Sequence, residues 1–282
     1  MKVTSVLSIL IAAFLVSCSS NQSEKSSGNH DDLGHGFTIE NEEELVSKIN
    51  LLVLNNLTTP ISVIEKLNKE EKVYHPEYAN SLENVNTYDT KFSQALNYGG
   101  YGLDLMYRVA HGHFIDVVQY KDKTLPLAKS IGLDSFYDQT DLQKFVDIAG
   151  NHLSLNQFIM DEYHRIDEYL MSHHNYQAAI LTITGCMLEG MYFTGKTIEE
   201  KNEVDDVIYK LLVNEKNLLH QVVPLYDYFK DNEKMVSLKK ELLKVQEDFD
   251  KFTTKESLNM ELAHTLDEDI ITLRERVVSN QI

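Results

Sequence analysis

The stretch Leu258–Val277, LNMELAHTLDEDIITLRERV, decides the fold class of this 282-residue chain. Its apolar residues recur every three or four positions, at Leu258, Leu262, Leu266, Ile270, Leu273 and Val277. Because an α-helix completes one turn in about 3.6 residues, these side chains form a single apolar stripe with polar residues opposite. The stretch is therefore predicted to be an amphipathic helix packed on a core.

The same periodicity extends through most of the chain. A second stripe precedes the first, at Met235, Leu238, Leu242, Val245, Phe249 and Phe252, and Asn232 is placed to cap its helix. Further helices are predicted over residues 85–110, 176–195 and 202–223, and no run of five residues alternates as a strand would. We predict an all-α fold, in which antiparallel helices joined by short loops form a multi-helix bundle.

Two segments of the chain resemble each other at an offset of 85 residues. ALNYGGYGLDLMY at 95–107 aligns with ILTITGCMLEGMY at 180–192, with identical residues at five positions and Asp104 opposite Glu189. Repeated helical pairs bury their apolar faces against one another. Two interpretations stay open, an internal duplication of helical pairs in the manner of TPR proteins and ordinary bundle packing.

Four of the glycines in these two segments are candidates for a helix crossing, Gly100, Gly102, Gly185 and Gly190. A glycine inside a helix costs about 1 kcal/mol relative to alanine, so four of them require a packing reason. We predict that they mark a close crossing of the two helices.

Each segment also carries an acid three residues before a tyrosine, Asp104 before Tyr107 and Glu189 before Tyr192. Residues at this spacing share a helix face, and a carboxylate beside a tyrosine hydroxyl can form a strong hydrogen bond. Such acids either fix the helix crossing or form a site for a ligand or a proton. We expect the structural role.

The N-terminus reads MKVTSVLSILIAAFLVSC, with Lys2 as its only charge. The apolar run is shorter than the about 20 residues that span a bilayer and is typical of a secretory signal peptide. Leu15–Cys18 resembles a bacterial lipobox, in which the cysteine is acylated and becomes the first residue. We predict a signal peptide over 1–17, acylated Cys18 with a flexible tether over 18–40, and a helical domain over 41–282.

Charge and cysteine content restrict the partners. The chain has a formal charge of −18, which becomes −19 when Lys2 leaves with the signal peptide. This charge repels nucleic acid, so we expect a membrane reached through the lipid anchor and another envelope protein as partners. The second cysteine, Cys186, lies in an apolar run and is predicted to be buried.

No catalytic motif is present: the chain has no H-E-x-x-H, no G-x-S-x-G and no glycine-rich phosphate loop. His113 and Asp116 are the nearest approach to a metal site, but a third ligand is missing. We expect no cofactor and a binding or scaffold role in place of catalysis. The alternative is a small-ligand or metal-binding protein with its site near Asp104 and Glu189, or near His113 and Asp116.

The patterns NYGGYGLDLMYR and LEGMYFTGK resemble a family of Bacteroidetes envelope lipoproteins with N-Y-G-x-Y-G-x-D-L-x-Y early and E-G-L-Y late. The resemblance spans about residues 85–225. It implies an all-helical, lipid-anchored envelope protein and assigns no catalytic residue. Ser19 lacks the acidic character that retains enterobacterial lipoproteins in the inner membrane, so we expect the outer membrane of a Gram-negative bacterium.

Overall fold

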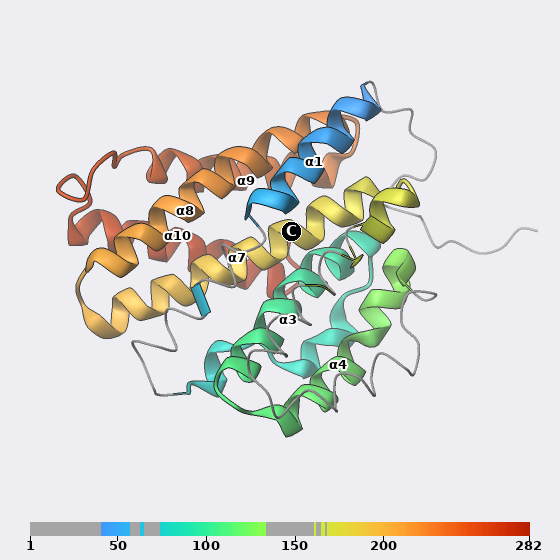
Figure 1. Ribbon diagram of the computed structural model, residues 1–282, viewed down its shortest axis with the longest axis horizontal. Helices are drawn as coiled ribbons and strands as arrows, with labels where there is room; N and C mark the ends of the chain where they lie inside the picture. Colours follow the sequence, from blue (N-terminus) through green and yellow to red (C-terminus); the bar gives the residue numbers. More distant parts are fainter. Residues whose placement is uncertain (1–40, 57–62, 65–73, 134–160, 162–164, 167) are drawn as a thin grey trace, which may run out of the picture. The chain divides into compact units, whose positions relative to one another are not determined.

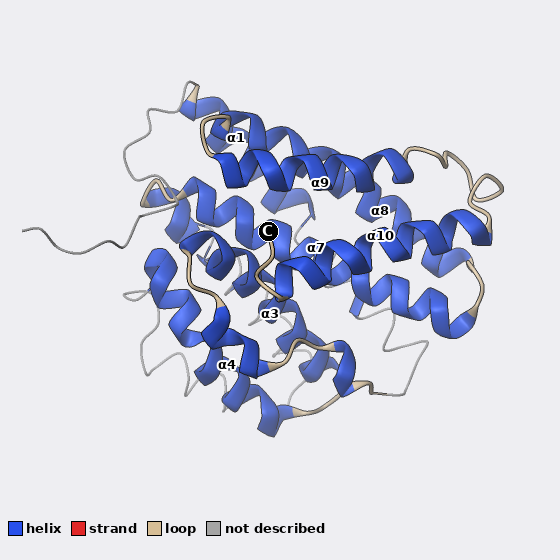
Figure 2. Ribbon diagram, turned by 180° about the vertical axis from the view of Figure 1, so that it is seen from behind, coloured by secondary structure: helices blue, strands red, loops and turns tan. Residues whose placement is uncertain are grey.

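The computed structural model describes residues 41–56, 63–64, 74–133, 161, 165–166 and 168–282. Within those ranges the regular structure is helical throughout and contains no strand, so the all-α prediction is confirmed there (Figure 2). The predicted signal peptide, the tether and Cys18 lie outside the described residues.

The described elements follow one another along the chain as helices and short helical turns. The α-helices are α1 (Glu42–Asn56), α3 (Lys91–Ala110), α4 (Phe114–Ala128), α7 (Tyr176–Lys201), α8 (Asp206–Val222), α9 (Glu233–Phe249) and α10 (Met260–Val278). The shorter turns are η1 (Pro76–Tyr78), η2 (Leu82–Thr87), η3 (Lys129–Leu133) and η4 (Val223–Phe229).

Polar side chains cap the N-termini of α8 and α9. Asp205 accepts hydrogen bonds from the backbone of Val207 and Ile208 at 2.9 and 2.8 Å, which starts α8. Asn232 starts α9 in the same way, as predicted. These side chains satisfy N–H groups that have no partner within the helix.

The predicted helix over residues 85–110 is divided in the structure. Thr90 has extended backbone angles and forms a capping box with Ser93, so α3 begins at Lys91. Residues Leu82–Thr87 form the separate turn η2. A capping box satisfies two backbone N–H groups at once, which fixes the helix start at this point.

Helix α7 lies at the centre of the described helices. Figure 1 shows α7 with α3 and α4 on one side and α8 and α9 on the other, and Figure 2 shows α10 running close to α7. Residues of α7 are buried around the whole helix from Tyr176 to Ile198. Because α7 is covered on all sides, it is apolar all around instead of along one stripe.

The two C-terminal stripes face the core as predicted. In α10, Leu266, Ile270, Leu273 and Val277 are buried, and α9 buries the corresponding stripe that starts at Met235. None of the helices that the structure describes has the length and apolar character needed to cross a membrane.

Candidate functional site

Asp104 on α3 is the most enclosed of the predicted site residues, with 0% of its surface exposed. Its Oδ2 atom accepts three hydrogen bonds: from the backbone N of Asn80 at 3.0 Å, from Asn80 Nδ2 at 2.8 Å and from the Tyr120 hydroxyl at 2.7 Å. Asn80 precedes η2 and Tyr120 belongs to α4. This carboxyl therefore joins three parts of the chain that are distant in sequence.

The second oxygen of Asp104 stands in a different environment. Asp104 Oδ1 and Asn80 Oδ1 are both buried, and neither has a hydrogen-bond partner among the described residues. Burial raises the pKa of the Asp104 carboxyl well above its usual range, and the nearby Glu189 carboxylate raises it further. A proton on Oδ1 makes this atom a donor and keeps the carboxyl neutral.

Glu189 on α7 is held by Arg274 on α10. The Arg274 guanidinium donates to Glu189 Oε1 at 2.7 Å and to Oε2 at 3.1 Å. It also donates to the Tyr78 carbonyl at 3.2 Å and lies 4.1 Å from the centre of the Tyr192 ring. A two-point contact of this kind fixes both distance and orientation between α7 and α10.

The tyrosines that sequence placed beside the acids have other roles. The Tyr107 hydroxyl accepts a hydrogen bond from the His75 backbone at 2.9 Å, and Asp104 is bonded to Tyr120 instead. Tyr192 contacts Arg274 through its ring face. Sequence reasoning missed Asn80, Tyr120 and Arg274, although Arg274 does occupy a position four residues from Ile270 on the apolar side of α10.

The structure places the closest approach of α3 and α7 at Gly99 and Gly185. A β-carbon on Gly99 would lie 1.9 Å from the Thr182 carbonyl oxygen, and one on Gly185 would lie 1.8 Å from the Leu96 carbonyl oxygen. Neither distance leaves room for a side chain. The contact is reciprocal, because each glycine meets the carbonyl three residues before the other glycine.

Gly100 also lies at the crossing, because its backbone N is 3.2 Å from where a β-carbon on Gly185 would be, but a side chain on Gly100 itself would meet no clash. A β-carbon on Gly100 would meet Glu189 Oε2 at 3.5 Å, which is an ordinary contact distance. Gly102 is partly exposed on α3, and the Gly190 carbonyl accepts a bond from Thr194 within α7. The position that requires glycine on α3 is thus Gly99, one residue before the predicted one.

The weaker metal candidate, His113 with Asp116, is only partly covered by the described residues. The ring of His113 stacks on Tyr74 with 3.8 Å between ring centres, and the side chain of Asp116 lies outside the described residues. Across the ranges that the structure describes, no three or more histidine, cysteine or acidic side chains gather in a way that could hold a metal ion.

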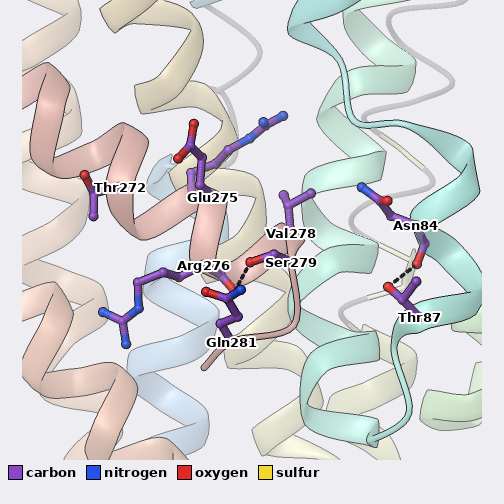
Figure 3. Close-up of a pocket in the computed structure, with 9 residues that line it drawn as sticks. Asn84, Thr87, Thr272, Glu275, Arg276, Val278, Ser279 and Gln281 are labelled. Atoms are coloured by element: carbon purple, nitrogen blue, oxygen red, sulfur yellow. Dashed lines mark hydrogen bonds between the residues drawn. The ribbon is translucent and has the colours of Figure 1, made fainter.

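A polar hollow of about 630 Å³ opens between η2 and the C-terminal end of α10. Figure 3 shows Asn84 and Thr87 of η2 on one side of it, and Thr272, Glu275 and Ser279 on the other. Arg274, the residue whose guanidinium holds Glu189 in the interior, is also among the residues that line the hollow.

Arg274 therefore belongs to two features, the ion pair with Glu189 on α7 and the lining of a hollow that solvent can enter. The hollow offers hydroxyl and amide groups together with charges of both signs, which suits a polar ligand.

No protein family model, no curated protein and no solved structure matches this chain.

Proposed function

We propose that this protein is a lipid-anchored, non-enzymatic binding module of the Gram-negative outer membrane. Its acylated Cys18 and tether hold the acidic helical body close to the membrane, and the body captures a polar segment of another envelope protein. The lipobox-like sequence before Cys18 and the resemblance to Bacteroidetes envelope lipoproteins support the address. The three acyl chains of a lipobox product anchor far more firmly than a single chain.

One observation carries the binding role, the hollow built against Arg274. Because Glu189 and the Tyr192 ring hold the Arg274 side chain, the wall of the hollow is ordered at this residue before any ligand arrives. A preformed site spends less free energy on ordering its own side chains when it binds. The exposed residues Thr272 and Ser279 add hydroxyl groups at its edge.

The role of the buried acids in this proposal is structural. Asp104 and Glu189 are enclosed and hydrogen-bonded to the chain itself, so they hold α3, α7 and α10 in place. Removing one member of such a network leaves a buried polar group without its partner, which costs stability.

The experiment is capture of envelope proteins by variants that fill the hollow. Thr272→Tyr and Ser279→Tyr place a large side chain at an exposed position of its wall, and Ser237→Tyr on the outer face of α9 is the matched control. We expect the first two variants to fold like the wild type and to lose the cross-linked envelope partner that the wild type and Ser237→Tyr retain. Equal capture by all four proteins would contradict the proposal.

A second candidate function places the ligand at the acids themselves. The observation in its favour is the pair of buried oxygens without a partner, on Asn80 and Asp104. It predicts that Asp104→Asn and Glu189→Gln stay fully stable yet lose a small molecule or metal that native mass spectrometry detects on the wild type. Loss of stability in both variants supports the structural role.

We also propose that the α3 and α7 segments arose by duplication within an antiparallel bundle. The 85-residue offset, which aligns Asp104 with Glu189 and Gly100 with Gly185, supports this origin.

A further inference from the structure

Glu215 on α8 is a second enclosed acid, which the proposed binding function does not use. It is 2% exposed, and its Oε1 atom lies 2.5 Å from the Thr194 hydroxyl on α7. Its Oε2 atom has no hydrogen-bond partner among the described residues. An ionised carboxylate enclosed in this way would carry a charge with one neutral contact to stabilise it.

The Thr194 hydroxyl has one proton and two neighbouring oxygens that can accept it, on Glu215 and Gly190. The Thr194 oxygen lies within hydrogen-bond distance of both Glu215 and the Gly190 carbonyl, the latter at 3.3 Å. A hydroxyl has only one proton to donate, and a carbonyl can only accept. Thr194 can donate to Glu215 Oε1 at 2.5 Å, or it can donate to Gly190 and accept a proton from a Glu215 carboxylic acid; in both cases Glu215 Oε2 stays enclosed without a partner among the described residues.

The same arrangement occurs earlier on α7 with a residue that does carry a proton. Thr184 donates to the Ile180 carbonyl at 2.8 Å and lies 2.7 Å from the Tyr226 hydroxyl, which can donate to it. Glu215 and Thr194 repeat this chain with a carboxyl in place of the phenol. The geometry therefore suits a neutral carboxylic acid.

Asp267 on α10 is another enclosed acid, and it approaches Gly195, the residue that follows Thr194 on α7. It is 3% exposed, and its Oδ1 atom lies 1.8 Å from where a β-carbon on Gly195 would be. That oxygen has no hydrogen-bond partner in the part of the chain that is described. Its carboxyl also contacts the carboxyl of Glu199, and two acids in contact share a proton more readily than they both ionise.

We propose that the segment 190–199 of α7 is a proton-dependent junction, on which α8 and α10 pack through the protonated carboxyls of Glu215 and Asp267. Each proton supplies a hydrogen bond and removes a buried charge. When the protons leave, two carboxylates remain enclosed against α7, and the packing of both neighbouring helices weakens.

Among the described residues, few other charged groups face the junction. The pKa of Glu215 responds to burial and to the Thr194 hydroxyl alone. Asp267 faces Glu199 and Lys196 on α7 and Glu268 on its own helix. Lys196 is paired with Glu199 at 2.6 Å, so its charge is already balanced in part.

The pH range follows from these environments. Burial raises the pKa of Glu215 to about 8, and burial together with Glu199 raises the pKa of Asp267 to about 7. Unfolded acids release their protons near pH 4, so between there and pH 8 the folded state binds more protons. The stability that these two carboxyls contribute must therefore fall as the pH rises through this range.

The test compares urea unfolding of the full chain at pH 6 and pH 9 for the wild type and Glu215→Gln. Between these pH values the unfolding constant of the wild type should rise at least about tenfold more than that of the variant. At pH 9 the variant should be the more stable protein. Asp267→Asn should reduce the pH dependence in the same direction.

Glu241→Gln on α9 is the control, because ion pairs lower the pKa of Glu241 and keep it ionised across this range. It should keep the full pH dependence of the wild type. If Glu215→Gln does not fold, Glu215→Met removes the same charge with an apolar side chain of similar length. Parallel curves for the wild type and a folded Glu215 variant would overturn the proposal.

Discussion

Gly99 and Gly100 are adjacent on α3, and replacing each of them separately by alanine should change the stability of the protein in opposite directions. In Gly99→Ala the new β-carbon would lie 1.9 Å from the Thr182 carbonyl oxygen, and 2.8 and 2.9 Å from two further backbone atoms of α7. A carbon and a carbonyl oxygen ordinarily stay at least about 3.3 Å apart, so α3 and α7 would have to separate by about 1.4 Å. Backbone atoms cannot rotate away as a flexible side chain can.

Overpacking of a core costs about 1–3 kcal/mol, and a clash with backbone belongs at the upper end of that range. Alanine in a helix returns about 1 kcal/mol relative to glycine. We therefore expect Gly99→Ala to lose about 2 kcal/mol, which for a domain of this size lowers the melting temperature by about 4–8 °C.

Gly100→Ala is the matched comparison, because its β-carbon meets its nearest neighbours at 3.5, 3.6 and 3.9 Å. It keeps the helix-forming gain of up to about 1 kcal/mol without the clash, so its melting temperature should rise by about 2–4 °C. Thermal unfolding followed by circular dichroism measures both variants. Shifts of the same sign, or an unchanged Gly99→Ala, would refute the placement of the crossing at Gly99.

Three further predictions concern single side chains. Arg274→Met should cost about 3–5 kcal/mol in urea unfolding, because it leaves the Glu189 carboxylate buried without its ion pair; full stability of this variant would mean that the pair does not hold α7 and α10 together. Tyr120→Phe removes one of the donors to Asp104 and should cost about 1–2 kcal/mol, measured against Tyr228→Phe on the surface. Labelled fatty acid should enter the wild type and not Cys18→Ala, and equal labelling would exclude the lipobox.

Some of the site was accessible to sequence reasoning because its signal is chemical and local. An acid inside an apolar helix must have a partner, so Asp104 and Glu189 could be selected from residue type and position alone. The residues that bind these two acids could not be selected in this way. Tyr120 and Arg274 are 16 and 85 residues away along the chain, and only the packing of α4 and α10 against the acids brings them into contact.

The glycines show where a local pattern stops being informative. Gly99 and Gly100 are adjacent and share nearly the same sequence neighbours, yet their positions differ by a rotation of about 100° about the helix axis. Which of them faces α7 depends on the rotation of α3 about its axis, and that rotation is set by all side chains of the interface together. Sequence therefore predicted a close crossing but placed it one residue too far along α3.

The sequence by itself determined the helical class, the apolar stripes of α9 and α10 and the Asn232 cap. Each of these depends on residues within one or two turns of each other, and backbone geometry fixes how such residues are spaced. Tertiary structure alone decided that Gly99 meets Thr182, that Arg274 pairs with Glu189 beside a hollow, and that Glu215 lies against Thr194. These contacts join residues from different helices, and their existence depends on the distances and angles at which whole helices pack.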